Sequence, residues 1–376
     1  MSVLERQGSA SAGFIGGVEL TAVDQGLVVT TVSTVGDPAH LKLIAWQISG
    51  DIQANIAGAQ FIVRKGEAST DEVTDQGGVV SIGNYRIVTA LRDSHHKLKL
   101  IAWQLSANGQ IERRGEAAAG GYGEAAIAIL DATRFLTFLS DPIDPNKYKL
   151  IVWNVSADGN NIQREGEVEN IGTCSIPRAV AIGPLSDGYG VVTPLRDANG
   201  NLKLIAWWIS ADGQQVWRKG EASAGAIHGI AANWMKNVVD PVNPGVENAV
   251  VITAVRDASG NLKVIRWHVS RDQKQQISRH GDATAGAIHS DIAVTKVGTM
   301  SQADHLITAV RSAEDDYLKL IAWDISGYDQ VKRQGAASAG NILAIDIEPI
   351  WMNHLVTAVR TGDGKLKLIG WKYSIP

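Results

Sequence analysis

The chain has 376 residues, a formal net charge of −4 and a pI near 6.1. This weakly acidic charge, without any basic run, argues against a nucleic-acid partner, because such partners are held mainly through Lys and Arg. A single cysteine excludes an internal disulfide framework, and no segment is long and apolar enough to span a bilayer.

The first phrase of interest is LERQGSA at Leu4–Ala10, because its Arg-x-Gly core returns throughout the chain. From residue 27 onward the chain repeats a unit of about 50 residues. Within each unit, β-branched and apolar runs are bounded by Gly, Asp and Asn, which predicts four strands. We name these strands A to D, from the expected axis outward.

The most uniform run is the predicted strand C, which reads LKLIAW in four copies and YKLIVW, LKVIRW or LKLIGW in the other three. It ends in tryptophan in every copy. Its seven copies are 41–46, 98–103, 148–153, 202–207, 262–267, 318–323 and 366–371. Strand B precedes it, as in VVITAVRD at 250–257, and an Arg-x-Gly phrase on strand D follows the first six copies. The seventh such phrase is LERQGSA, so we predict that the N-terminal strand completes the last unit.

This repeat predicts an all-β fold, a closed seven-bladed β-propeller with four-stranded blades. Closure by the N-terminal strand would leave no unpaired edge between the first and last blades. We expect residues 1–376 to form a single domain, since propellers grow by radial repetition. Without a signal pattern at the N-terminus, the protein is expected to be cytoplasmic and of bacterial type, with unconventional export left open.

Two repeated side chains have a structural interpretation. The strand-C tryptophans recur at one phase, which indicates that they fill the wedge between neighbouring blades, with stacking platforms for sugars as the alternative. The Arg of each Arg-x-Gly phrase is expected to tie blades together. These arginines are Arg6, Arg64, Arg113, Arg164, Arg218, Arg279 and Arg333.

The arginine that ends strand B is a candidate for ligand binding. It is present in five copies, as Arg92, Arg196, Arg256, Arg311 and Arg360, and Ser33 and Ser140 replace it in the others. We expect it to face an acid in the loop between strands D and A. These acids are Glu67, Glu116, Glu167, Glu221 and Asp282. An exposed Arg beside a carboxylate could bind carbohydrate hydroxyls through charge-assisted hydrogen bonds, and a structural ring of ion pairs is the alternative.

The first residues of strand A break the repeat, and we expect them at the mouth of a central channel. Eight residues after the Arg-x-Gly glycine, three successive copies carry Cys174, His228 and His289. One residue further on, the two preceding copies carry Asp75 and Glu124.

This axial set suits proton transfer. The histidines could act as acid and base, the cysteine as a nucleophile or wall residue, and the two carboxylates as orienting groups. Scattered polar residues in a solvated channel are the structural alternative. Two His and a Cys could also bind zinc, but the ligand spacing is not diagnostic, so neither a metal nor a cofactor is predicted.

The whole chain resembles seven-bladed propellers of the bacterial and fungal lectin type, in its unit length, its one tryptophan per blade and its one-strand closure. That resemblance implies monosaccharide pockets between blades, on the face with the strand-B arginines. The phrases GEASAG, ITAVRD and LKLIAW also look like the propeller half of cyanobacterial cyclophane-forming alkyltransferases.

Two functions are therefore expected from the sequence. The first is a non-catalytic, multivalent carbohydrate-binding module. The alternative is an enzyme that acts on a small organic molecule at the channel mouth. The expected partner is thus a glycan or a small organic molecule, and the oligomeric state stays open.

Overall fold

The computed structural model describes residues 3–24, 26–36, 39–49, 61–144, 147–298, 304–351 and 353–374; the side chains of 71–76, 170, 171 and 290 lie outside the described set. All regular elements in these ranges are β-strands. They are β1 (Leu4–Asp24), β2 (Leu27–Thr34), β3 (His40–Ile48), β4 (Ile62–Gly83), β5 (Arg86–Asp93), β6 (Lys97–Leu105), β7 (Ile111–Gly121), β8 (Ala125–Ile129), β9 (Arg134–Ser140), β10 (Lys147–Val155), β11 (Ile162–Ile171), β12 (Val180–Leu185), β13 (Gly188–Arg196), β14 (Asn201–Ser210), β15 (Val216–Val239), β16 (Glu247–Asp257), β17 (Asn261–Ser270), β18 (Ile277–Val297), β19 (His305–Ser312), β20 (Tyr317–Asp324), β21 (Lys332–Trp351), β22 (His354–Thr361) and β23 (Lys365–Tyr373). Over the described residues, nothing helical has the length and apolar character needed to cross a membrane.

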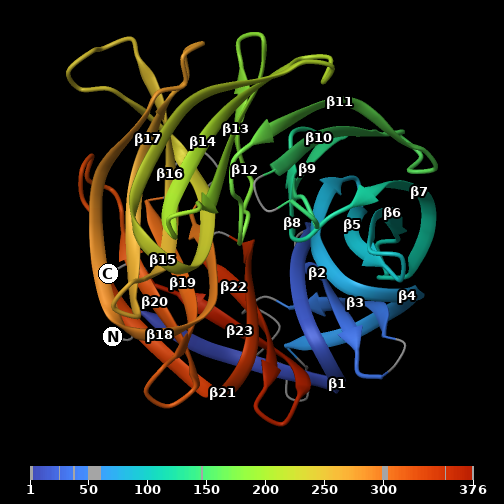
Figure 1. Cartoon of the computed structure of the whole chain (residues 1–376). Helices are drawn as coiled ribbons and strands as arrows, with labels where there is room; N and C mark the ends of the chain where they lie inside the picture. Colours follow the sequence, from blue (N-terminus) through green and yellow to red (C-terminus); the bar gives the residue numbers. More distant parts are fainter. Residues whose placement is uncertain are drawn as a thin grey trace.

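The strands pair antiparallel in groups of four, which we call blades and name after their strand-C tryptophan. They are the Trp46 blade (β1–β2–β3–β4), the Trp103 blade (β4–β5–β6–β7), the Trp153 blade (β8–β9–β10–β11), the Trp207 blade (β12–β13–β14–β15), the Trp267 blade (β15–β16–β17–β18), the Trp323 blade (β18–β19–β20–β21) and the Trp371 blade (β21–β22–β23–β1). In chain order, each blade follows the last around a common centre (Figure 1).

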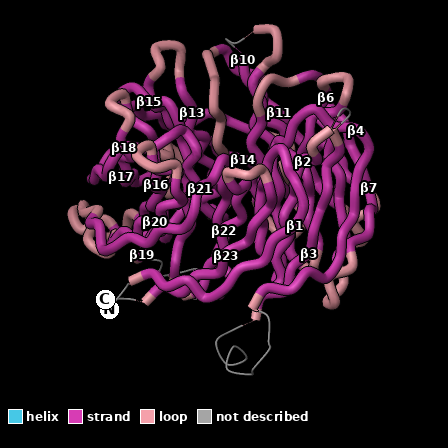
Figure 2. Tube along the Cα trace, turned by 90° about the horizontal axis from the view of Figure 1, so that it is seen from below, coloured by secondary structure: helices cyan, strands magenta, loops and turns pink. Residues whose placement is uncertain are grey.

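The longest strands serve two blades in succession. For example, β15 pairs with β14 through Val216–Ala226 and with β16 through Ile227–Val239. Likewise, β1 pairs with β23 from Leu4 and with β2 from Ile15. The two ends of the chain consequently lie side by side (Figures 1 and 2).

The core lies in the wedges between blades, because the inward-facing residues of one blade meet those of the next. Around Trp207, for instance, Val191 and Ile205 of its own blade pack against Phe138 and Leu150 of the Trp153 blade. Each strand-C tryptophan is at most 2 % exposed. The structural interpretation of these tryptophans is therefore confirmed, and burial rules them out as sugar platforms.

Every one of these tryptophans is also fixed by a hydrogen bond. The indole N–H donates to a threonine hydroxyl on strand B at 2.8 to 3.0 Å. The acceptors are Thr30, Thr89, Thr137, Thr193, Thr253, Thr308 and Thr357. Such a partner is needed because an indole N–H buried without one would cost free energy.

Candidate functional site

The strand-B arginines are half-buried, and three of them join adjacent blades. Arg92 donates to the Gly123 carbonyl at 3.3 Å, Arg256 to Ile288 at 2.8 Å and Arg360 to Gly16 at 3.2 Å. Each of these carbonyls lies where strand A of the next blade begins. The main role of these three guanidinium groups is therefore to tie neighbouring blades together.

The other two strand-B arginines behave differently. Arg311 bonds Asp316 in its own B–C turn at 2.7 and 3.0 Å, and it lies 3.9 Å from Asp291. The Nε of Arg196 is buried without a hydrogen-bond partner among the described residues.

The acids expected in the D–A loop lie instead within strand D, opposite the isoleucine of strand C. Glu221 thus pairs with Ile205 and Asp282 with Ile265. The expectation was wrong because strand D does not end at the Arg-x-Gly glycine. A β-bulge at the middle residue of that phrase lets the strand continue, and the ladder shifts register there in every blade.

The bulge also changes the partner of each acid. Residues three apart on a regular strand face opposite sides, but one bulged residue between them puts both on the same side. The Arg of the Arg-x-Gly phrase therefore pairs with the acid of its own strand. The pairs are Arg64–Glu67, Arg113–Glu116, Arg164–Glu167, Arg218–Glu221 and Arg279–Asp282. Arg218 also donates to the Tyr148 hydroxyl of the Trp153 blade at 3.4 Å, which is the expected tie between blades.

The strand-C lysine completes this cluster, which we call the Lys–acid–Arg triad. Its ammonium lies 2.8 to 3.6 Å from the same carboxylate in all five blades. The lysines are Lys42, Lys99, Lys149, Lys203 and Lys263. The lysine was not singled out in the sequence, although its fixed place in LKLIAW was the available signal.

Small pockets recur between blades, and their cationic walls come from these triads. One of about 200 Å³ has Lys263, Ile265 and Arg279 in its wall. Another of about 140 Å³ has Lys203, Ile205 and Arg218, and a third of about 110 Å³ has Lys149, Ile151 and Arg164. Two further segments close each pocket. One is the B–C region of the same blade, such as Asp257 in the largest of the three. The other is the D strand or the D–A connection of the preceding blade, such as Gly225. None of the five strand-B arginines lines these three pockets.

The predicted axial set is not assembled into one site. Cys174 is 4 % exposed and packs beside Trp207. Its burial, together with nearby Glu124, raises the pKa of the thiol to about 12, so it stays protonated near neutral pH and suits a wall residue rather than a nucleophile. His228 is exposed on β15, whereas His289 lies 2.9 Å from Asp316.

The two predicted carboxylates have different outcomes. Glu124 lines the central cavity and accepts a hydrogen bond from the backbone N–H of Ile176. The side chain of Asp75 lies outside the described residues. Across the described residues, no hydrogen bond or ion pair joins Cys174, His228 and His289 to one another.

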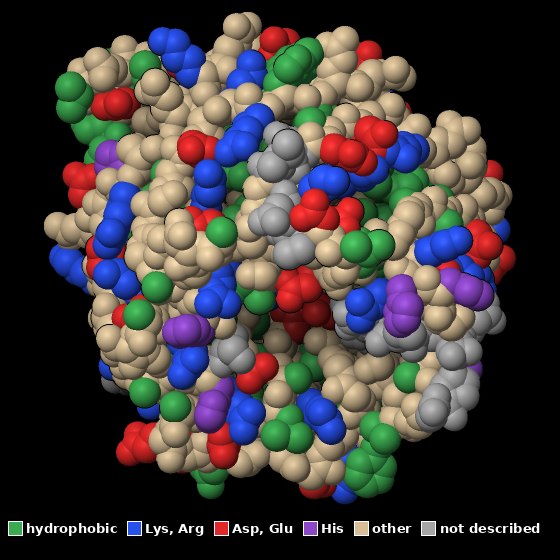
Figure 3. All heavy atoms as spheres, in the orientation of Figure 1, with side chains coloured by type: hydrophobic (Ala, Val, Ile, Leu, Met, Phe, Trp, Pro, Cys, Tyr) green, Lys and Arg blue, Asp and Glu red, His purple; other side chains and the backbone are tan. Residues whose placement is uncertain are grey.

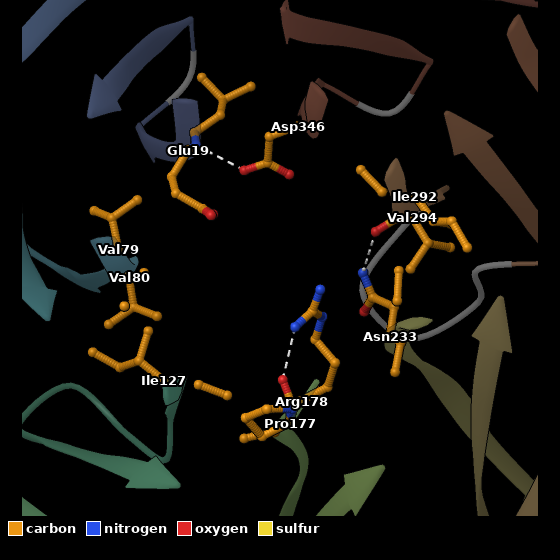
Figure 4. A pocket seen from close by; sticks show the side chains of 18 of the residues that line it. Glu19, Val79, Val80, Ile127, Pro177, Arg178, Asn233, Ile292, Val294 and Asp346 are labelled. Atoms are coloured by element: carbon orange, nitrogen blue, oxygen red, sulfur yellow. Dashed lines mark hydrogen bonds between the residues drawn. The ribbon is translucent and has the colours of Figure 1, made fainter. Parts of the chain in front are cut away.

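The central cavity has a volume of about 490 Å³, and every blade contributes to its wall, the Trp207 blade through the segment 176–179 just before β12. Glu19, Arg178 and Asp346 project into it from different blades (Figure 4). Acidic atoms are visible deep inside the central hollow of the molecular surface (Figure 3). Its most polar wall is the sequence Asp346-Ile347-Glu348 on β21, whose alternate residues face the cavity.

These carboxyl groups have unusual proton affinities. Burial raises the pKa of Asp346 from 3.8 to about 6, although the Leu20 and Ile347 amides and Arg178 oppose the shift. The Leu20 N–H donates to Asp346 Oδ2 at 2.7 Å. Burial, and then the neighbouring Asp346, also raise the pKa of Glu348. This pair lies beyond the first residues of strand A and was not predicted from the sequence, although no other strand A has alternate acids.

The cavity does not gather ligands for a metal ion. Within the described ranges, no three His, Cys, Asp or Glu side chains are close enough to hold one. Its carboxyl groups and its single guanidinium could instead bind a small polar molecule or exchange protons with it.

Four-stranded antiparallel blades around a central cavity define a β-propeller, and that is the fold of this chain. No family model matches the sequence, and no curated protein matches it. Solved structures do match. Sqt1 of Saccharomyces cerevisiae is similar over 100 % of both chains, with 12 % identity and a TM-score of 0.53.

Two bacterial structures are also similar to this chain. A putative 6-phosphogluconolactonase from Bacteroides uniformis matches over 85 % of this chain and 88 % of its own, with 10 % identity and a TM-score of 0.55. Another, from Bacteroides fragilis, matches over 85 % and 86 %, with 13 % identity and a TM-score of 0.53. At such low identity these likenesses establish the fold alone.

Proposed function

We propose that the chain is a closed seven-bladed propeller that acts as a non-catalytic binding module, with several equivalent carbohydrate pockets between its blades. The observation that carries this proposal is the recurrence of one pocket, with Lys, Ile and Arg at the same strand positions in three places. The seven strand-C tryptophans and the pairing of β1 with β23 support the closed ring.

The pocket chemistry suits hydroxyl-rich ligands. Lysine and arginine offer fixed donors, and the neighbouring carboxylates offer acceptors, so that one sugar ring could receive and donate charge-assisted hydrogen bonds. The volumes of about 110 to 200 Å³ limit each pocket to a single ring or the end of a chain. Several weak pockets on one rigid ring would give a high avidity for a branched glycan.

A glycan array with the purified protein tests this proposal. The double variant Lys203→Met with Lys263→Met removes one donor from each of two pockets and keeps an unbranched, flexible side chain. The control, Lys219→Met with Lys274→Met, removes the same charge from exposed positions outside the pockets. We expect the first variant to lose most of the array signal and the control to keep it. Absence of binding at millimolar glycan, or equal signals from both variants, would refute the proposal.

The central cavity favours a second candidate function, an enzyme that acts on a small organic molecule. The supporting observation is the Asp346 and Glu348 pair, since a carboxyl with a pKa of about 6 can both donate and accept a proton near neutral pH. In this scheme Asp346 replaces the histidines of the axial set as the acid–base group. Small-molecule screening against the wild type and Asp346→Asn tests it, and hits that bind both proteins equally would exclude it.

A further inference from the structure

The Lys–acid–Arg triad is incomplete in two blades. The position that carries an acid in five blades is Ala336 in the Trp323 blade and Ser9 in the Trp371 blade. The register is the same, because Ala336 pairs with Ile321 and Ser9 with Ile369 of strand C. The substitution thus removes the carboxylate and leaves the backbone around it unchanged.

The two cations of each triad are nevertheless retained. The Trp323 blade keeps Lys319 and Arg333, and the Trp371 blade keeps Lys367 and Arg6. For the part of the chain that the structure describes, no ion pair involves Lys319, Arg333 or Lys367. Arg6 donates to the Ser9 hydroxyl at 2.9 Å, which is a neutral partner.

Among the described residues, no nearby carboxylate takes over the role of the missing acid. Asp315 does not, because it accepts from the Tyr317 backbone N–H at 3.1 Å, and this bond lowers its pKa more than Lys319 does. The side chains of Ala336 and Ser9 are both exposed, so a ligand could reach the vacated position from solvent.

The complete triads show what would fit there. In them, one carboxylate lies within ion-pair distance of both the Lys ammonium and the Arg guanidinium, for example 3.2 Å from Lys203 to Glu221. Arginine binds planar or tetrahedral oxyanions through two parallel N–H groups, and lysine adds a point charge. A carboxylate, sulfate or phosphate group of a ligand would therefore replace the missing side chain.

We infer that the Trp323 and Trp371 blades carry anion subsites, formed by Lys319 with Arg333 and by Lys367 with Arg6, that take an oxyanion group of the ligand. This inference rests on the proposed carbohydrate function, in which the oxyanion belongs to a sulfated or uronic-acid sugar. The preference for charged glycans would then reside in two blades, and the blades with complete triads would accept neutral rings.

Calorimetric titration at low ionic strength tests the inference, with sodium sulfate, a sulfated monosaccharide, glucuronate and inorganic phosphate as separate probes and sodium chloride as the ionic control. The variant Ala336→Glu with Ser9→Glu restores the acid of the other five blades. It should weaken binding of the oxyanions by about tenfold or more, equivalent to about 1.4 kcal/mol. The control Ala107→Glu with Ala211→Glu adds the same two charges in exposed turns and should leave binding unchanged.

A second variant should gain an oxyanion site. Glu221→Ala removes the acid between Lys203 and Arg218, so it should raise the number of oxyanions bound from two to three. Binding that survives Ala336→Glu with Ser9→Glu, or an unchanged stoichiometry in Glu221→Ala, would overturn the inference. If the simple anions bind as expected but no glycan does, the subsites stand and the carbohydrate function fails.

Discussion

The indole of each strand-C tryptophan donates to a buried threonine, and most of these threonine hydroxyls lie near a strand-C carbonyl in turn. In the Trp207 blade, Trp207 Nε1 lies 2.8 Å from Thr193 Oγ1, which lies 3.5 Å from the Ile205 carbonyl. Both groups are fully buried. The sequence predicts the buried tryptophan, but it does not predict the threonine as its partner, since the two are 14 residues apart and meet only through the pairing of neighbouring strands.

Thr193→Val tests this hydrogen bond. The change keeps the side-chain volume but leaves the indole N–H without a partner, so the free energy of unfolding should fall by about 1–3 kcal/mol. Urea denaturation measures it. The exposed Thr284→Val is the control and should stay within about 0.5 kcal/mol of the wild type. Equal stabilities for both variants would show that the bond contributes nothing.

Asp346 is a second residue with a testable property. Its raised pKa means that the folded state binds the proton more tightly than the unfolded chain does. The protonated Asp346 carboxyl therefore stabilises the folded state fully below pH 3.8, and this stabilisation is lost as the pH rises through about 6.

The variant Asp346→Asn should remove much of that pH dependence. Its melting temperature should exceed that of the wild type at pH 7.5, where the wild-type carboxyl is charged, and the difference should shrink at pH 4. The exposed Asp212→Asn is the comparison, since its carboxyl has a lowered pKa instead. Parallel melting curves for Asp346→Asn and the wild type across this range would contradict the assigned pKa.

At the scale of the element, strand D is shaped by the Arg-x-Gly bulge. The glycine is required by close approach to the following blade: a Cβ added at Gly115 would lie 2.5 Å from the Asn160 carbonyl oxygen. The sequence predicts a strand and a glycine here, but not that the strand continues beyond it. A bulge depends on the ladder with strand C, and a constant spacing of three between Arg and acid was the only sign of it.

Gly115→Ala should consequently destabilise the protein by about 1–3 kcal/mol, because the backbone carbonyl it meets cannot move aside freely. Gly120→Ala is the matched control on the same strand, where an added Cβ would meet nothing within 4 Å. Thermal melting of both variants provides the measurement. A loss of stability in Gly120→Ala equal to that in Gly115→Ala would refute the packing argument.

At the scale of the whole molecule, the repeat of tryptophan phrases was enough to predict blades and their strand order. The grouping of the central acids could not be predicted from this repeat. Glu19 and Asp346 are far apart in the chain, and they face one cavity only because β1 and β21 lie side by side. The sites between blades were only partly predictable for the same reason, since each pocket combines residues of two blades.

The pairing of β1 with β23 has a direct consequence for stability. Deleting residues 1–10 removes most of the ladder from Leu4 to Phe14 with β23, and it removes the buried Leu4 itself. We expect unfolding to become easier by at least about 3 kcal/mol, the usual cost of losing a buried leucine. Deleting residues 1–2, ahead of β1, is the control. Identical urea curves for the two truncations would exclude the closed ring.

In the proposed function, ligands bind between blades rather than on the axis. A crystal structure with a glycan selected from the array tests this placement most directly. We expect electron density beside Lys203 and Arg218, and beside Lys263 and Arg279, with the sugar hydroxyls in contact with these side chains. Density confined to the central cavity beside Asp346 and Glu348, with the pockets between blades empty, would contradict it.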